Sequence, residues 1–591
     1  MHCATHSILD SGEVFSKTMD TVHRRLNRRG FLVSIGSGLT AALALAACQP
    51  AAPAAPTTAP AAAAKPTTPP AAPAAPTTAP TAVTKPTTAA ASAPTSAAAA
   101  PTTTAAANVK RGGTLNWAEI ADPISFDPHT RSNASASNVQ RLIYESFTRM
   151  DPHTMDVQPA LATGWKYNSP TELVFTLRQG VKFHNGQTFS AEDAKWNIDR
   201  MIDPATGNPF ASWYAAIGST SIVDNNTIKL TLKNADPVLP EKFSAMRVSG
   251  FAPAGSDPTA LASQPIGTGP FKLSQWTQND QAVLQRNGSY WDSGFPYLDT
   301  LNVKVVADED TRIAGLRAGQ LDWGLVSADG AKRLQGTQTI KTISGPQAVF
   351  TVLKYNQRFK PFADARVRQA LDMAIDRKLV ITNALGGAGA LTGPIPYGWA
   401  DYGIAPDQLP FKLDMAGAKN LLSAAGVGSG FQVDCVTLPE GNSTHFYETI
   451  ATIADGWKQL GVQVNLQPME LAAWLDKNNK NDFDLIVSNR GFRGDPIDIL
   501  MPAFHSGGVD NQGYTNPQVD TWLDQASTEP DRTKRRDLYL QVEKQVMADA
   551  VWSFLWVPVE TDAMQTYVQG YDHVAFDGFR DLMAATWIDK G

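Results

Sequence analysis

The chain has 591 residues, of which 43% are hydrophobic and 18% charged, and it contains 24 Phe, 14 Trp and 13 Tyr. Such a length and aromatic content suit a large folded body and exclude a fibre. The formal net charge of −6 comes without a basic stripe, which argues against nucleic acid as a partner, and three cysteines are too few for a disulfide framework.

Residues 1–48 have the pattern of an export signal. Arg28 and Arg29 form a twin-arginine pattern, and the apolar stretch 31–47 that follows is shorter than the roughly 20 residues that a membrane span needs. The stretch ends in Leu-Ala-Ala-Cys, which resembles a bacterial lipobox, so we expect cleavage before Cys48 and a lipid on its thiol. Two alternatives stay open: a single-span anchor, and an ordinary basic signal region without twin-arginine export.

Processing at this box also defines the mature chain. Met19 lies at a normal distance before the two arginines, so residues 1–18 are interpreted as an upstream extension of the true start. With Cys3 removed and Cys48 lipidated, Cys435 remains alone. We therefore expect a mature protein without disulfides.

Residues 49–107 are almost wholly Ala, Pro and Thr, and AAPAAPTTAP occurs twice, at 51–60 and at 71–80. A segment with so little aliphatic bulk cannot offset the entropy of ordering and is predicted to be a disordered tether. Its prolines favour extended stretches that could hold a body on the order of 100 Å from the lipid. The Thr and Pro content leaves O-glycosylation open.

A folded body is predicted from Lys110, with strands and helices mixed throughout. The stretches 173–177 and 228–232 alternate apolar and polar residues, which indicates half-buried strands. Ser190 and Asp193 have the spacing of a capping box at the start of a helix. The fold class is therefore α/β.

The C-terminal half repeats a helix-to-strand order. Helix 448–460 is expected to stop at Gly461 and to lead into a strand at 462–466, and a further strand is expected at 482–488 after another helix. This alternation predicts a partly parallel sheet.

One more helix is expected to begin after a cap at Asp364. Its apolar face consists of Val367, Ala370, Leu371, Ala374 and Ile375. Asp376 and Arg377 are expected to cap or pair at a helix end.

Several longer motifs occur along this body in a fixed order. They are RGGTLNWAEIADPISFDPH (111–129), IYESFTRM (143–150), QPALATGWKY (158–167), FTLRQGVKFHNGQTFSAEDAKWNIDR (175–200), PIGTGPFKL (265–273), PFADARVRQALDMAIDRK (361–378) and GYTNPQVD (513–520). In this order they resemble family 5 of the bacterial extracellular solute-binding proteins, the peptide-, nickel- and opine-type binding lipoproteins of ABC importers. His184, within the longest motif, is interpreted as a structural turn residue rather than a metal ligand.

The resemblance implies an α/β, two-lobed type II periplasmic-binding-protein fold with an extra subdomain in lobe one. The implied segments are 110–145, 267–345 and 562–591 for lobe one, 146–266 for the extra subdomain, and 346–561 for lobe two, with hinges near 345 and 561. Ligand binding would then bias an equilibrium between open and closed lobes.

As a function, the resemblance implies a monomeric, lipid-anchored, extracytoplasmic protein in the periplasm or on the outer cell surface. It would capture a small solute, most commonly a peptide or peptide-like compound, and deliver it to an ABC permease with a cytoplasmic ATPase. An oligosaccharide or opine ligand, and a receptor that feeds a sensor, are the alternatives. Because the HExxH, GxSxG, P-loop and GxGxxG patterns are absent and the nine histidines lack metal-ligand spacing, no enzyme, metal or cofactor is expected.

The segment after the strand at 482–488 holds the main binding candidates, because α/β folds often bind ligands beyond strand carboxyl ends. By resemblance, peptide-binding members carry an aspartate here that pairs with the α-ammonium, and this chain has Phe492 in that place. Phe492 can stack on a flat or sugar-like face and Arg493 can fork onto a carboxylate, unless Arg493 pairs with Asp495 or Asp498.

Four further residues complete the candidate ligand contacts. Asn489 lies in the same segment, and Asp495 is the alternative partner for a cationic group. Trp399 and Phe126 lie in loops that, by resemblance, approach the cleft, and each is either a ligand stacker or a packing residue.

Overall fold

The computed structural model describes residues 109–130, 133–244, 249–396, 399, 402–491, 494–573 and 579–590. Every described residue belongs to the unit Thr103–Gly591. The predicted export signal with Arg28 and Arg29, the lipidation site Cys48 and the tether all lie outside the described residues.

A 12-stranded sheet is the main element of the described body, with the order β16-β15-β17-β13-β18-β11-β1-β10-β9-β8, and β12 and β14 pair with β18 beside this path. Its strands are β1 (Thr114–Glu119), β8 (Phe271–Thr277), β9 (Gln281–Arg286), β10 (Thr300–Val305), β11 (Trp323–Val326), β12 (Ile340–Pro346), β13 (Val349–Tyr355), β14 (Gly389–Ala390), β15 (Gln432–Thr437), β16 (Gln463–Pro468), β17 (Leu485–Gly491) and β18 (Trp552–Gln565).

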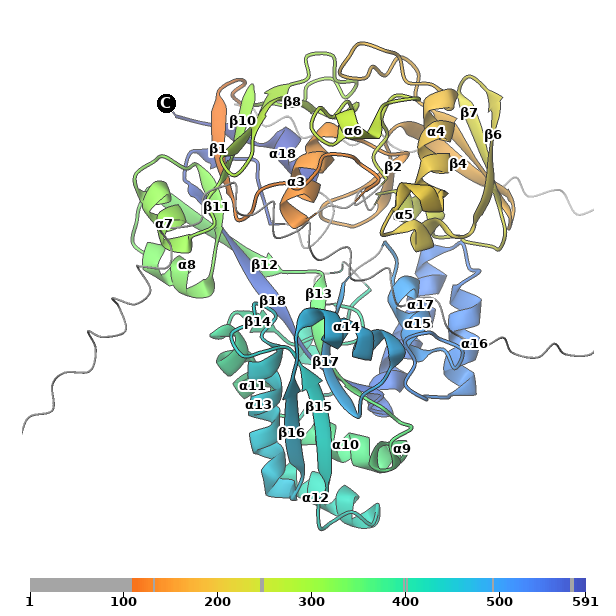
Figure 1. Cartoon of the computed structure of the whole chain (residues 1–591), viewed down its shortest axis with the longest axis vertical. Coiled ribbons are helices and arrows are strands. Elements are labelled where there is room, and N and C mark those ends of the chain that lie inside the picture. Colours follow the sequence, from red (N-terminus) through yellow and green to blue (C-terminus); the bar gives the residue numbers. More distant parts are fainter. Residues whose placement is uncertain are drawn as a thin grey trace, which may run out of the picture. The chain divides into compact units, whose positions relative to one another are not determined.

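The longest strand, β18, joins the two halves of this sheet (Figure 1). Its first part pairs with β13 and its last part with β11 and β12. Both parts are fully buried, while residues 558–560 between them are half-buried. In the first part, WSFLWV, five of six residues are apolar, as is typical of a strand that is covered on both faces.

The half that contains β13–β17 has the predicted parallel arrangement. β15 pairs in parallel with both β16 and β17. Helix α13 (Phe446–Trp457) continues as a 3-10 turn, Lys458–Leu460, and ends at Gly461, whose φ of 76° is the left-handed conformation expected of a C-terminal glycine. The predicted helix–strand order is therefore confirmed.

A separate four-stranded sheet, β4-β5-β7-β6, lies at residues 162–232. Its strands are β4 (Ala162–Ser169), β5 (Glu172–Leu177), β6 (Ile217–Asp224) and β7 (Thr227–Leu232). Helix α4 (Ala191–Ile202) packs on it and begins with the predicted reciprocal capping box of Ser190 and Asp193. The core under the helix contains stacked phenylalanines, with the rings of Phe147 and Phe175 4.2 Å apart.

The remaining elements connect and cover these sheets. They are β2 (Thr148–Met150), β3 (Val157–Pro159), β19 (Val568–Gln569), β20 (Trp587–Ile588), α3 (Ala134–Ile143), α5 (Leu239–Ser244), α6 (Pro258–Leu261), α7 (Glu309–Arg317), α8 (Ala328–Leu334), α9 (Lys360–Ala363), α10 (Ala365–Met373), α11 (Arg377–Leu385), α12 (Met415–Ala424), α14 (Leu471–Lys480), α15 (Ile497–Phe504), α16 (Pro517–Ala526), α17 (Arg532–Ala548) and α18 (Phe579–Ala585).

The helix predicted after Asp364 is shorter than expected. Asp364 does cap α10, but this helix ends at Met373, so Ala374 and Ile375 are buried in the connection beyond it. The reason is a second cap: the Asp376 carboxylate accepts the Leu379 N–H at 2.9 Å and starts α11. Arg377 pairs with Asp372 at 2.5 Å, as expected of a residue at a helix end.

Within the described part of the chain, no helix combines the length and the apolar character that crossing a membrane requires. The same residues hold no group of three or more His, Cys, Asp or Glu side chains placed to bind a metal ion.

Candidate functional site

The parallel strands of both halves direct their carboxyl ends toward the crossing of β18. In one half, Gly491 at the end of β17 pairs with Val349 at the start of β13. In the other half, Val326 at the end of β11 pairs with Thr561 of β18. Because ligands of α/β folds bind outside such carboxyl ends, this region is the candidate binding site.

The segment after β17 contributes the predicted contacts. Asn489 is exposed and pairs with Thr351 in the ladder of β13 and β17. Phe492 and Arg493 directly follow β17 in the sequence and lie outside the described residues. All three remain predicted ligand contacts.

Asp495, the next predicted contact, is buried with 1% of its surface exposed. One carboxylate oxygen accepts the Tyr539 hydroxyl at 2.5 Å and the Ile497 N–H at 3.0 Å, and the other accepts from Arg535 at 3.3 Å. In this arrangement Asp495 fastens the segment after β17 to α17, and ligand contact by Asp495 stays a prediction.

The two aromatic candidates are packing residues in this arrangement. The Phe126 ring is fully buried and meets the Trp276 ring edge-on, with centroids 4.9 Å apart. Trp399 is 2% exposed and its ring lies 6.0 Å from that of Tyr402. Stacking of either ring on a ligand would require its neighbours to move, and it remains a prediction.

The crossing itself carries a cluster of ionisable side chains that the sequence interpretation missed. The Asp562 carboxylate on β18 accepts the Trp323 indole N–H at 2.9 Å and lies 3.2 Å from Nδ1 of His573. Nε2 of His573 lies 3.3 Å from the Pro346 carbonyl oxygen on the other crossing segment. No local motif marks these residues, because Trp323 and Pro346 lie 239 and 227 residues from their partners Asp562 and His573.

The charges of this cluster shift the pKa of two of its members. Burial lowers the pKa of His573, but the bonded Asp562 carboxylate and the Pro346 carbonyl outweigh burial and raise it above its ordinary value. Burial, and then the neighbouring Asp562 charge, raise the pKa of Glu560. The crossing is thus an acidic region that favours the protonated form of His573.

A buried lysine lies on β13, where it pairs with Ile486 of β17. Lys354 Nζ donates to Asp510 at 2.7 Å and Asn478 at 3.2 Å, and it lies 5.0 Å from the centroid of the Trp552 ring. Burial and the nearby Arg490 charge lower the pKa of Lys354 to about 7. A single lysine inside the apolar run 348–355 was the sequence signal for this group, which the interpretation did not use.

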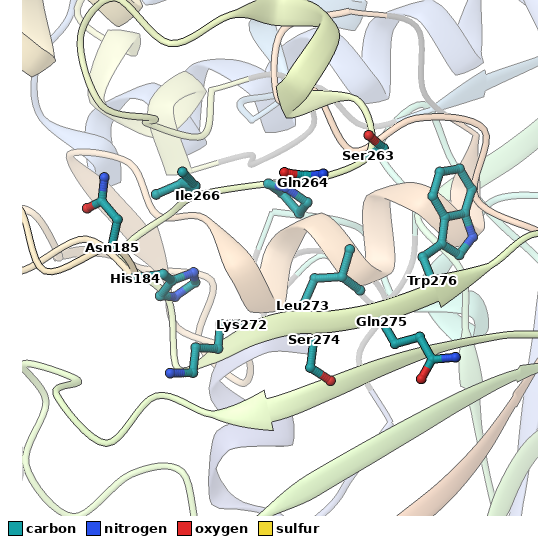
Figure 2. Close-up of a pocket in the computed structure, with 11 residues that line it drawn as sticks. His184, Asn185, Ser263, Gln264, Ile266, Lys272, Leu273, Ser274, Gln275 and Trp276 are labelled. Atoms are coloured by element: carbon teal, nitrogen blue, oxygen red, sulfur yellow. The ribbon is translucent and has the colours of Figure 1, made fainter.

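A surface pocket of about 590 Å³ lies along β8. Figure 2 shows Trp276 at one end of the pocket and His184 with Asn185 at the other. The two nitrogens of His184 meet the Gly269 carbonyl at 3.0 Å and the Gly267 N–H at 3.4 Å, and burial lowers the pKa of this imidazole to about 4. His184 therefore shapes a turn in its neutral form, which confirms its predicted structural role.

The fold and the convergence of strand ends define a two-lobed solute-binding protein. Residues 156–511 match the profile of the bacterial extracellular solute-binding proteins, family 5, middle region, and the chain belongs to this family. A curated relative is the glutathione-binding protein GsiB of Pectobacterium atrosepticum, 28% identical over 452 residues that cover 73% of this chain and 86% of GsiB.

Solved structures share the fold. HbpA2 from Haemophilus parasuis superposes with a TM-score of 0.73 at 22% identity, covering 81% of this chain and 100% of HbpA2. The binding protein AgaA from A. tumefaciens R10, solved with agropinic acid, gives a TM-score of 0.65 at 24% identity and covers 81% of this chain and 99% of AgaA.

These similarities confirm the predicted family and the two-lobed α/β fold. The protein is an extracytoplasmic solute-binding component of an ABC importer, and its relatives are solute-binding proteins rather than enzymes.

Proposed function

We propose that the protein captures a small, peptide-like organic acid between two lobes and delivers it to an ABC permease as a monomer. The observation that carries this proposal is the position of β17, whose carboxyl end lies at the crossing and is followed directly by Phe492 and Arg493. An aromatic ring and a guanidinium suit an uncharged face and a carboxylate rather than a lone α-ammonium.

The ligands named for two similar proteins support this choice of chemistry. GsiB is named for glutathione, and AgaA was solved with agropinic acid. Both compounds carry carboxylate groups and are larger than a single amino acid. Glutathione also has a free α-ammonium, but its γ-linked glutamate keeps a carboxylate beside it. The competing ligand classes are therefore α-linked peptides, whose α-ammonium has no such neighbour, and neutral oligosaccharides.

The lobes that enclose the ligand would be 110–145, 267–345 and 562–591 on one side and 346–561 on the other, with 146–266 as an extra subdomain. Pairing of β18 with β13 in one half and with β11 and β12 in the other supports bounds near 345 and 561. The half-buried residues 558–560 are suitable hinge positions.

A thermal-shift screen of residues 103–591 tests the ligand class. We expect glutathione or an opine acid to raise the melting temperature, since a ligand at a hundredfold excess over its Kd adds about 2.7 kcal/mol of stability. An α-linked dipeptide, a neutral oligosaccharide and Ni²⁺ serve as comparison ligands. A shift with oligosaccharide or dipeptide alone would contradict the proposed organic acid.

The anchor belongs to the same proposal. Lipid on Cys48 and a spacer at 49–107 would hold the body at the outer face of the membrane, after export directed by Arg28 and Arg29. Replacing Cys48 by Ser should release the protein from washed membranes into the soluble fraction. Retention of the C48S protein in membranes would instead support a single-span anchor.

A further inference from the structure

The extra subdomain contacts the other half of the body through short helix α5. Lys242 on α5 lies 3.4 Å from the Asp498 carboxylate on α15, and Glu241 on α5 accepts from Arg535 on α17 at 2.8 Å. In Figure 1, α5 faces α15 and α17. A third pair, Arg532 with Asp156, lies at the more exposed rim of the same contact.

In one inner pair the cation lies on the extra subdomain, and in the other it lies on α17. Each cation holds one carboxylate on its own side of the contact and one on the opposite side. Lys242 bonds Asp236 of the extra subdomain at 2.9 Å and faces Asp498 across the contact. Arg535 lies 3.3 Å from Asp495 on its own side and bonds Glu241 across the contact.

Without its cation, each inner pair would become two carboxylates that face each other in a dry contact. The side chains of Lys242 and Arg535 are 10% and 1% exposed. Two carboxylates that face each other repel strongly where water is excluded. The two cations therefore decide whether the surfaces can meet.

The contact also reaches the segment after β17. Gly494 has a φ of 108°, and a Cβ at this position would lie 3.3 Å from the Glu241 carbonyl oxygen, so the backbone at 494 packs directly on α5. Asp495, the next residue, bonds the same Arg535 that holds Glu241. The segment that carries the proposed ligand contacts and the extra subdomain thus share one guanidinium.

Two atoms of the cluster are left unsatisfied. Arg535 Nε and one oxygen of Asp498 have no hydrogen-bond partner among the described residues, although both are buried. Buried ion pairs with incomplete hydrogen bonding contribute little net stability, because the cost of removing both charges from water offsets their attraction. Such a contact can open without a large energetic cost.

We propose that Lys242 and Arg535 form a two-cation latch that joins the extra subdomain to lobe two and fixes Gly494 and Asp495 near the end of β17. The latch rests on the proposed function, because its opening and closing accompany the movement of the lobes. Arg535 and Lys242 are positioning residues: they act on the ligand through Asp495 and through the alignment of α5.

The carboxylates across the latch make its closure sensitive to pH. Burial raises the pKa of Asp498 to about 6 and that of Glu241 to about 7. Asp498 faces Lys242, Asp236 and Asp495, and Glu241 faces Arg535 and Asp495. Because both acids hold their protons more tightly when the latch is closed, lowering the pH from 8 toward 5 should favour the closed state.

Pulsed electron paramagnetic resonance between two spin labels measures the latch directly. Val223, 58% exposed on β6, and Gln525, exposed on α16, are replaced by Cys and labelled in the chain from Gln49 to Gly591, in which Cys435 is buried. Lys242→Met should raise the ratio of separated to joined molecules at least tenfold at pH 8. Adding Asp498→Asn to it should restore the joined distance, because the confronting carboxylates are then removed.

The matched control is Lys229→Met. Lys229 pairs with Glu172 within the same subdomain, at 3.5 Å and 35% exposure for each side chain, so its loss removes the same charge without touching the latch. A distance distribution that is the same in Lys242→Met and Lys229→Met would overturn the latch. So would a separated population that Asp498→Asn fails to restore.

These outcomes are independent of the ligand screen. If glutathione or an opine acid stabilises the protein while Lys242→Met leaves the distances unchanged, the latch is wrong and the proposed function stands. If no ligand of the screen binds while Lys242→Met separates the labels and Asp498→Asn rejoins them, the latch holds and the proposed ligand class is wrong.

Discussion

His573 and Asp562 face each other where β18 passes between the two halves of the main sheet, with Nδ1 of the imidazole 3.2 Å from a carboxylate oxygen. The other ring nitrogen lies 3.3 Å from the Pro346 carbonyl oxygen. Both nitrogens thus face acceptors, and a neutral imidazole has only one N–H to donate. The doubly protonated ring braces both crossing segments, and the neutral ring loses one of the two bonds.

This brace predicts a stability that falls with rising pH. The pKa of His573 is raised in the folded protein, so its contribution is fully present below the unfolded value of about 6.5 and is lost as the pH rises through the folded pKa. We expect the free energy of unfolding in urea to fall between pH 6 and pH 8.5. Because Glu560 and Tyr571 also lie in this cluster, the measured quantity is the difference between wild type and His573→Gln. An equal pH dependence in both proteins would rule out the brace.

Gly345 is predicted to be essential to the same brace. A Cβ at this position would lie 2.1 Å from Cδ2 of His573, so Gly345→Ala must displace the ring from Asp562 and Pro346. We expect a loss of about 1–3 kcal/mol in urea unfolding, as is typical of overpacking. The control is Gly288→Ala, where an added Cβ meets nothing within 4 Å. If both variants are equally stable, the close approach of His573 does not exist in solution.

Cys435 should be unreactive in the folded protein. Its side chain is fully buried in β15, and burial raises the pKa of the thiol, which leaves almost no thiolate at neutral pH. Residues 103–591, which contain no other cysteine, should therefore react with an aromatic disulfide reagent only after urea unfolds them. Rapid reaction of the native protein would show that the core of β13–β17 opens locally.

The elements that the sequence predicted well are those with a local cause. The capping box of Ser190 and Asp193 spans four residues, and the turn at Gly461 follows from a single glycine after an apolar helix. The two-lobed fold was predicted from the family motifs. The helix after Asp364 was predicted too long because apolar spacing continued past a cap at Asp376 that local periodicity does not register.

The parts of the site that the sequence did not reveal are contacts between residues that are far apart in the chain. Arg535 meets Asp495 and Glu241, which are 40 and 294 residues away in the chain. The pattern around Asp495 marked it as a candidate ligand contact, but nothing in that pattern shows that α17 occupies its carboxylate. Lys354 was similarly hidden, since its partners Asn478 and Asp510 come from other elements.

The remaining prediction concerns Phe492, which we interpret, by resemblance alone, as standing where peptide-binding members of the family carry an aspartate. Phe492→Asp introduces a carboxylate that can pair with an α-ammonium and removes a ring that can stack on a ligand. We expect this variant to lose at least tenfold in affinity for the organic acid identified by the screen and to gain affinity for a free-amine dipeptide, as measured by titration calorimetry. Asn225→Asp, in an exposed turn between β6 and β7, adds the same charge away from the crossing and should change neither affinity. Unchanged binding of every ligand by Phe492→Asp would remove this residue from the site and leave Arg493 and Asn489 as the contacts to test.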